Sequence, residues 1–222
     1  MSSLDKIIDL AQSNHPDLDS QLASYEGPKT NSELAAISDD RWLSMMTRCV
    51  FQAGFVWKVI EAKWDGFETA FEGFKPIPIS FYSDDDVARL VSDTRIIRNG
   101  QKIMATVQNA QFVGDISAEY GSFGAFIAQW PSEDQLGLLA ILKARGSRLG
   151  GMTAQYFLRF SGWDAWMLSR DVITALIREG VVEKAPTSKK ALADVQTAFN
   201  DWAEQSGLSR AQISRILALS VG

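Results

Sequence analysis

Hydrophobic positions recur along this chain mostly at the three-to-four-residue spacing of amphipathic helices. Leu4, Ile7, Ile8 and Ala11 share one face of a short first helix. The same spacing predicts further helices over residues 40–54, 56–64, 65–74, 87–92, 101–112, 123–130, 135–142, 152–160, 172–179, 188–205 and 209–217. Strand-like alternation is confined to residues 78–82. The pattern therefore predicts an all-α protein.

Helix-capping and helix-breaking residues divide this pattern. Pro76 and Pro78 are expected to break the chain between helices. Residues 15–29 are polar and rich in helix breakers, so we expect a loop there. The acidic run at 83–86 is expected to cap and open the next helix, with metal binding as the alternative.

The order of the elements predicts two helical lobes with a cleft between them. The chain contains no internal repeat and no low-complexity linker. We expect residues 1–222 to form one functional unit. Lobe A would comprise about 40–115, and lobe B about 1–39 together with 116–222.

Composition restricts the chemistry. Cys49 is the only cysteine and His15 the only histidine. An internal disulfide is therefore impossible, and a Cys/His zinc site is close to excluded. We expect neither a bound metal nor a cofactor.

Charge and hydropathy restrict the partners. The net charge of −5 argues against bulk attraction to nucleic acid, but it permits a local basic face. No apolar run reaches the roughly 18–20 residues of a membrane span, and the N-terminal residues lack a signal-peptide core. We expect a soluble cytoplasmic protein without a membrane partner.

A glycine-rich turn between two predicted helices, within residues 136–160, is the strongest candidate for binding chemistry. Backbone N–H groups and the positive end of a helix dipole form a ready site for one phosphate. Cations crowd the turn, and Ser147 and Thr153 supply hydroxyl donors. The candidate backbone-binding residues are Lys143, Arg145, Gly146, Ser147, Arg148, Gly150, Gly151 and Thr153. We interpret the turn as a DNA-backbone clamp; a plain αα-hairpin is the alternative.

The stretch LGGMTAQYFLRFSGW resembles the helix–hairpin–helix element of base-excision DNA glycosylases. In that superfamily an aspartate follows about twenty residues later, and here Asp171 follows Gly151 by twenty. The resemblance implies that Asp171 is catalytic. A helix N-cap is the alternative role, and Asp164 is the rival acid. The chain has LGGMTA in place of the usual GxG.

A longer segment, residues 48–112, resembles the core of the DNA-3-methyladenine glycosylase I family. The resemblance rests on QAGF and Trp57, FETAFEGF, and DDDVARLVSDTRIIRNGQKIMATVQNAQ. It implies base flipping into a pocket where Trp57 stacks on the base. The other expected residues of this site are the pocket residues Cys49, Phe51, Gln52 and Trp42 and the DNA wedge Gly54 and Phe55. A core role is the alternative for Trp57, Phe51, Trp42 and Phe55.

The chain departs from the family in two respects. The family commonly holds a structural zinc through Cys and His, which this chain cannot do. It also has a base-reading glutamate three residues before the Gln of QAG, and that position here is Cys49.

Arg98 and Lys102 are candidate phosphate contacts, with a solvated turn as the alternative.

Together these features predict a monomeric, monofunctional DNA glycosylase of base excision repair, associated with the bacterial nucleoid. It would remove alkylated purines such as 3-methyladenine from double-stranded DNA by hydrolysis. One alternative is a non-catalytic helix–hairpin–helix protein that binds damaged or branched DNA. Another is a helical scaffold without a nucleic-acid role.

Overall fold

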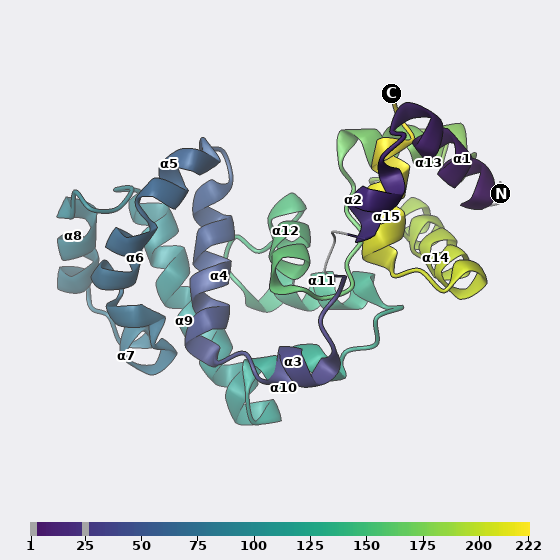
Figure 1. Ribbon diagram of the computed structural model, residues 1–222. Coiled ribbons are helices and arrows are strands. Elements are labelled where there is room, and N and C mark those ends of the chain that lie inside the picture. The colour runs from purple at the N-terminus through teal and green to yellow at the C-terminus, as the bar shows by residue number, and fades with distance from the viewer. Residues whose placement is uncertain (1–3, 24–26) are drawn as a thin grey trace. The chain divides into compact units, whose positions relative to one another are not determined.

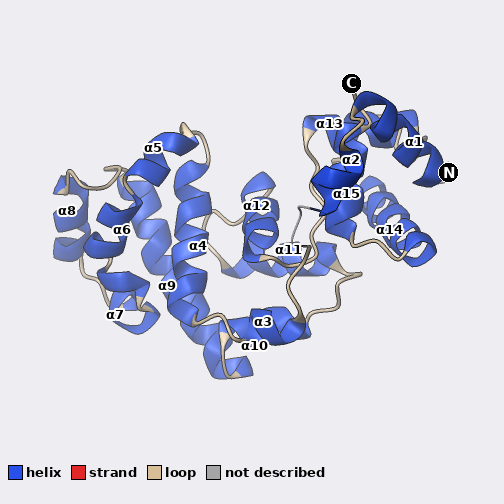
Figure 2. Ribbon diagram, viewed as in Figure 1, coloured by secondary structure: helices blue, strands red, loops and turns tan. Residues whose placement is uncertain are grey.

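The computed structural model describes residues 4–23 and 27–222, and every regular element in these ranges is helical (Figures 1 and 2). The all-α prediction is therefore confirmed. The polar segment 15–29 falls partly outside the described residues. No helix in the described ranges is long and apolar enough to cross a membrane.

The chain divides into two compact units. Unit 1 comprises Met1–Lys29, Pro131–Leu138 and Gly162–Gly222, and unit 2 comprises Thr30–Trp130 and Leu139–Ser161. These units differ from the expected lobes, because α10 packs on α3, α4 and α9 and thereby joins residues beyond 116 to the same core.

Unit 2 is built around α4 (Asp39–Gln52), which packs against both α9 (Gly100–Tyr120) and α12 (Met152–Ser161) (Figure 1). The remaining elements of this unit are α3 (Asn31–Ala35), α5 (Trp57–Ala62), α6 (Trp64–Ala70), η1 (Glu72–Phe74), α7 (Pro76–Ser80), α8 (Asp84–Ser92) and α10 (Phe123–Gln129). Helix α11 (Gln135–Arg145) begins in unit 1 and continues into unit 2. The α4–α9–α12 packing thus holds the QAG segment and the glycine-rich turn in one unit.

Unit 1 has its own hydrophobic core. It contains α1 (Leu4–Asn14), α2 (Leu18–Ala23), α13 (Arg170–Arg178), α14 (Lys189–Ser206) and α15 (Arg210–Leu219). Trp166 stacks on Phe199 at 5.4 Å between ring centroids, and Phe199 meets Trp202 edge-on at 5.8 Å. Large aromatic surfaces buried together supply much of the stability of such a small core.

Capping residues explain where many helices begin. The Ser83 hydroxyl accepts from the Asp86 backbone N–H, and the Asp86 carboxylate accepts from the Ser83 N–H at 2.9 Å. This capping box confirms that the acidic run opens a helix.

The proline-containing segment differs from expectation. Lys75 is extended and separates η1 from α7, so the chain breaks before Pro76 as expected, but Pro76 and Pro78 themselves begin α7, where the missing N–H of Pro76 costs nothing. The strand-like stretch 78–82 lies partly in this helix and forms no strand. Helix α2 lies within the segment that was expected to be a loop.

Candidate functional site

A cavity of about 350 Å³ opens in unit 2 where α4 ends, α5 begins and α12 passes. Gly54 adopts the left-handed conformation, with φ +76°, and turns the chain from α4 toward α5. The residues that line the cavity are Cys49, Gln52, Ala53, Gly54, Trp57, Met152, Thr153 and Tyr156. The structure therefore brings together three residues of the expected base pocket, Cys49, Gln52 and Trp57.

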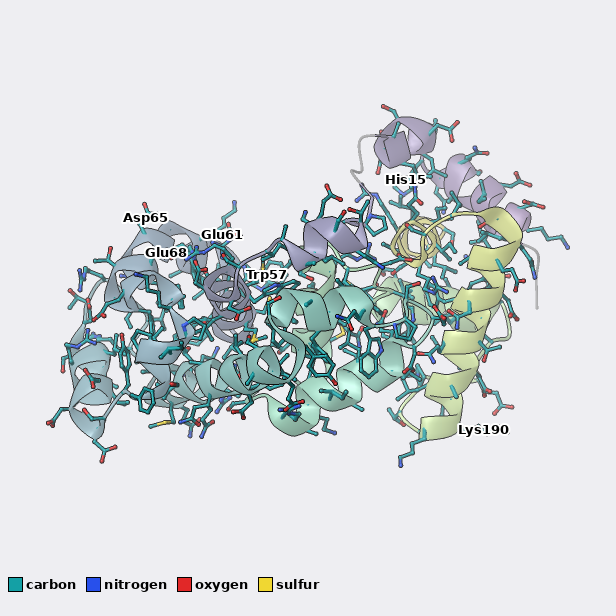
Figure 3. The ribbon with its side chains drawn as sticks, turned by 90° about the horizontal axis from the view of Figure 1, so that it is seen from below. His15, Trp57, Glu61, Asp65, Glu68 and Lys190 are labelled. Carbon is teal, nitrogen blue, oxygen red and sulfur yellow. The ribbon has the colours of Figure 1, made fainter. Side chains whose placement is uncertain are left out.

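Aromatic rings form one wall of this cavity. Trp57 is 37% exposed, at the start of α5, and is labelled in Figure 3. It meets Tyr156 edge-on at 5.0 Å and Phe160 edge-on at 5.8 Å. Edge-on packing fixes the indole and leaves part of it accessible, so a planar ligand has an aromatic surface on which to stack.

The polar groups of the cavity are uncharged. Burial raises the pKa of the Cys49 thiol to about 12, so the thiol stays protonated at neutral pH. The side chain of Gln52 is buried, and its Oε1 has no hydrogen-bond partner among the described residues. The lining contains no carboxylate. A ligand would meet an aromatic face, a glutamine side chain and a neutral thiol.

Lys102 holds the turn beside the cavity. Its Nζ donates to the carbonyl oxygens of Phe51 and Ala53 at 3.0 and 2.6 Å and lies 4.5 Å from the ring of Phe55. Burial and the nearby charge of Arg148 lower the pKa of Lys102. The buried ammonium thus caps the end of α4, and this position does not fit the expected phosphate contact.

Two expected pocket walls lie instead in the core. Trp42 is buried, donates through Nε1 to the Ile37 carbonyl at 3.1 Å and packs against Phe157. Phe51 is buried edge-on against Phe67 at 4.7 Å. Neither residue lines the cavity, because both point from α4 into its packing interfaces. Helical spacing alone could not distinguish these faces of α4.

The expected wedge remains at the surface. Phe55 is 40% exposed directly after Gly54. It borders a second cavity of about 430 Å³, which is also lined by the exposed Arg98. The exposure of Phe55 suits a wedge that inserts between bases.

The glycine-rich turn joins α11 to α12. Arg148 and Gly151 adopt left-handed φ angles of 57° and 56°. A Cβ atom at Gly146 would lie 2.7 Å from the Leu142 carbonyl oxygen, so this position requires glycine. Among the described residues, the backbone N–H groups at 148–151 have no hydrogen-bond partner. This turn presents free amides of the kind that bind phosphate oxygens.

Three side chains of α9 support the turn and the end of α11. Asn109 exchanges two hydrogen bonds with the backbone of Ser147. The guanidinium of Arg148 donates to Gln101 Oε1 at 2.6 Å, and that of Arg145 donates to both carboxylate oxygens of Glu119 at 3.0 and 2.6 Å. Lys143 is exposed, and Thr153 lines the cavity beside Trp57. The cations near the turn thus differ in how strongly other side chains of the protein already hold them.

Both candidate acids lie in unit 1. Asp171 is exposed in the first turn of α13, whose N-cap is Ser169, so the N-cap alternative for Asp171 is wrong. Asp164 accepts hydrogen bonds from the backbone N–H groups of Arg210 and Ala211 at 3.2 and 2.9 Å. Asp164 therefore anchors the start of α15, whereas Asp171 is open to solvent.

Sequence reasoning missed Met152 and Tyr156 as lining residues. Thr153, Tyr156 and Phe160 recur at three- and four-residue spacing on one face of α12. This face contacts Trp57, and its spacing in the sequence was the signal that could have identified the lining residues of α12.

Known proteins resemble this chain in sequence and fold. Residues 34–138 match the model of the methyladenine glycosylase family. DNA-3-methyladenine glycosylase 1 of Escherichia coli (strain K12) is 37% identical over 60 residues, which are 27% of this chain and 32% of the relative. The matched segment thus spans about a third of that relative.

Solved structures extend the likeness. A crystal structure of 3-methyladenine DNA glycosylase I is 26% identical, covers 62% of this chain and 82% of its own, and superposes with a TM-score of 0.51. The Methanocaldococcus jannaschii 8-oxoguanine glycosylase/lyase, solved with DNA, is 12% identical, covers 96% of this chain and 94% of its own, and has a TM-score of 0.53. This second likeness concerns the fold alone. The chain is therefore similar to the DNA-3-methyladenine glycosylase I family, as its QAG and Trp57 segment predicts.

Proposed function

We propose that this protein is a monofunctional DNA glycosylase of base excision repair that removes alkylated purines such as 3-methyladenine from duplex DNA. The observation that carries the proposal is the aromatic cavity at Trp57, which shares unit 2 with the Phe55 turn and the glycine-rich hairpin. The family match over residues 34–138 supports the same chemistry. The protein would act as a cytoplasmic monomer on nucleoid DNA and would need no cofactor.

The position of each residue supports the role that we propose for it. The free amides at 148–151, with Lys143 and Arg148, bind backbone phosphates. Phe55 enters the gap left by the extruded nucleotide, and the base stacks on Trp57. Arg98 provides a further phosphate contact at the surface.

Hydrolysis separates the base from the sugar. Water adds its oxygen to C1′ while the C1′–N bond breaks, and the products are the free base and an abasic site. Positive charge develops on the sugar in this step, and a carboxylate stabilises it and takes the proton of the water. We assign this role to Asp171, because Asp164 already accepts hydrogen bonds at the start of α15.

The neutral cavity gives a second function specific support. With Cys49 in the lining and no carboxylate there, a protein that binds damaged or branched DNA without cleaving it is the alternative. Asp171→Asn separates the two functions in parallel assays of DNA binding and base release. A glycosylase keeps its DNA affinity and loses at least about a hundredfold in release rate. A pure binder releases no base in either form.

A further inference from the structure

Lys102 connects the first turn of α9 to the turn that carries Phe55. The lysine side chain is only 5% exposed. Its Nζ lies 4.5 Å from the centroid of the Phe55 ring and donates to the carbonyl oxygens of Phe51 and Ala53 at 3.0 and 2.6 Å. A cation over an aromatic face at this distance attracts the ring. One ammonium group therefore holds both the ring of Phe55 and the backbone that precedes it.

The buried charge of Lys102 has no acidic partner in the described part of the chain. The ion pairs there do not include Lys102, and the charge that acts on it is the positive charge of Arg148. Burying a charge without an opposite charge costs free energy, and an apolar side chain would avoid this cost. Such a local cost is typical of functional positions and indicates that the ammonium does more than fill space.

Phe55 needs support of this kind to act as a wedge. It is 40% exposed and directly follows Gly54, whose φ of +76° belongs to the left-handed region. An exposed ring on a turn samples several rotamers, and fixing one of them on insertion into DNA costs conformational entropy. The Lys102 ammonium orders the ring before DNA binds and thereby removes part of this cost.

The same turn of α9 also holds the glycine-rich hairpin. Gln101, the neighbour of Lys102, accepts a hydrogen bond from the Arg148 guanidinium at 2.6 Å. Consecutive residues of one helical turn thus contact the proposed wedge and the proposed phosphate clamp, and all of them lie in unit 2. A rigid element that contacts both sites keeps the wedge at a fixed distance from the bound phosphate.

We propose that Lys102 is a positioning residue that sets the Phe55 ring for insertion into the DNA stack, without itself contacting a phosphate. The inference deepens the proposed function, because it rests on Phe55 as the wedge. Lys102 takes no part in bond cleavage and acts only through Phe55 and its turn.

The test measures insertion of the wedge separately from base release. The probe is a duplex in which 2-aminopurine flanks a tetrahydrofuran abasic analogue, because a side chain that enters this gap changes the stacking and the fluorescence of 2-aminopurine. We expect Lys102→Met to lower the equilibrium constant of insertion by about tenfold, the value of one desolvated cation–π contact. In the Phe55→Ala background, Lys102→Met should change the fluorescence no further. An equal effect in both backgrounds, or no fluorescence change with wild type, overturns the inference.

The salt dependence of binding to the same duplex tests the absence of a phosphate contact. Lys102→Met should keep the wild-type slope of log affinity against log salt, whereas a fall of about 1 would show a phosphate contact and overturn the inference. Lys190→Met is the matched control for loss of an ammonium group, because Lys190 is an exposed lysine on α14 in unit 1.

Phe55→Ala provides a readout that does not depend on the folding of Lys102→Met. In wild type without DNA, the ring current of Phe55 should shift the ε-methylene protons of Lys102 upfield in NMR spectra. Phe55→Ala, a change at an exposed side chain, should remove this shift. The same shift in both proteins would show that the ammonium does not hold the ring, and it would overturn the inference.

The two proposals fail separately. Impaired insertion in Lys102→Met, with no base release from methylated DNA by wild type, leaves the inference intact and removes the glycosylase function. Base release by wild type, with normal insertion in Lys102→Met, leaves the function intact and overturns the inference.

Discussion

Asn109 on α9 forms both of its amide hydrogen bonds with one residue of the hairpin turn, Ser147. Asn109 Oδ1 accepts from the Ser147 N–H at 2.7 Å, and Asn109 Nδ2 donates to the Ser147 carbonyl at 3.1 Å. The Asn109 side chain is completely buried. The long central helix thus fixes the backbone immediately before the free amides of the proposed phosphate site.

Loss of this amide should affect both stability and DNA binding. We predict that Asn109→Ala lowers the free energy of unfolding by about 1–3 kcal/mol, because the part-buried Ser147 backbone groups lose their partners. DNA affinity should fall as well, because the turn is no longer held. Denaturant titration and fluorescence anisotropy measure these effects, with the exposed Gln108→Ala as the control. Unchanged DNA affinity in a destabilised Asn109→Ala would show that the turn is not the clamp.

The salt dependence of DNA binding should distinguish the cations of the turn. Lys143 is exposed, whereas Arg145 forms a bidentate ion pair with Glu119. We predict that Lys143→Ala lowers the slope of log affinity against log salt by about 1, as expected for the loss of one phosphate contact. Arg145→Ala should change it less, because Arg145 must leave Glu119 to reach a phosphate. An equal change, or none in either variant, would contradict the clamp as described.

Much of the fold and part of the site follow from local sequence. The Ser83–Asp86 capping box and the amphipathic spacing of most helices need only neighbouring residues, and they were predictable. The QAG turn and Trp57 were identified through a family resemblance. The cavity contains Cys49, Gln52 and Trp57 as expected.

The remaining features depend on contacts between distant segments. Trp42 and Phe51 lie on the same helix as Cys49 and Gln52, and only the packing of α4 decides which side chains face the cavity. From the sequence alone, Lys102 is predicted to be a surface cation. Only the packing of α9 shows that its ammonium binds the carbonyl oxygens at the end of α4.

Acid should destabilise unit 2 through Glu68, which is labelled in Figure 3. Burial raises the pKa of Glu68, but hydrogen bonds from Arg41 and Ser44, the charge of Arg41 and a hydrogen bond from Trp64 outweigh it, and the pKa lies below its ordinary value. A lowered carboxyl pKa adds stability above the unfolded-state value of about 4.3, and this stability is lost as the pH falls through the folded-state value.

We therefore predict that Glu68→Gln melts at a lower temperature than wild type at pH 7, and that this difference shrinks as the pH falls below about 4.3. Thermal melts across this range provide the measurement. Glu61→Gln is the control, since Glu61 is an exposed acid on neighbouring α5. A difference that stays constant with pH would show that the Glu68 charge contributes nothing.

A carboxylate placed at Cys49 should change the preference of the cavity. Cys49 faces the cavity as a neutral group, so Cys49→Glu adds a negative charge that attracts a cationic alkylated purine. We predict that release of 3-methyladenine rises relative to release of hypoxanthine, an uncharged purine, by about tenfold for about 1.4 kcal/mol of added attraction. The gain should grow as the pH rises through the pKa of the new carboxyl group. Cys49→Ser, which adds no charge, should keep the wild-type ratio; the same ratio in Cys49→Glu would place the base elsewhere.

We expect this chain to extrude and excise an alkylated purine. The direct measurement is chromatographic identification of the bases released from methylated duplex DNA by wild type, Asp171→Asn, Trp57→Ala and the control Asp9→Asn, an exposed acid on α1. We predict release of 3-methyladenine by wild type and by Asp9→Asn. Trp57→Ala should be slower by about ten- to a hundredfold, the value of one lost stacking contact, and Asp171→Asn slower still. Wild-type protein that binds this DNA but releases no alkylated base would rule out the proposed glycosylase function.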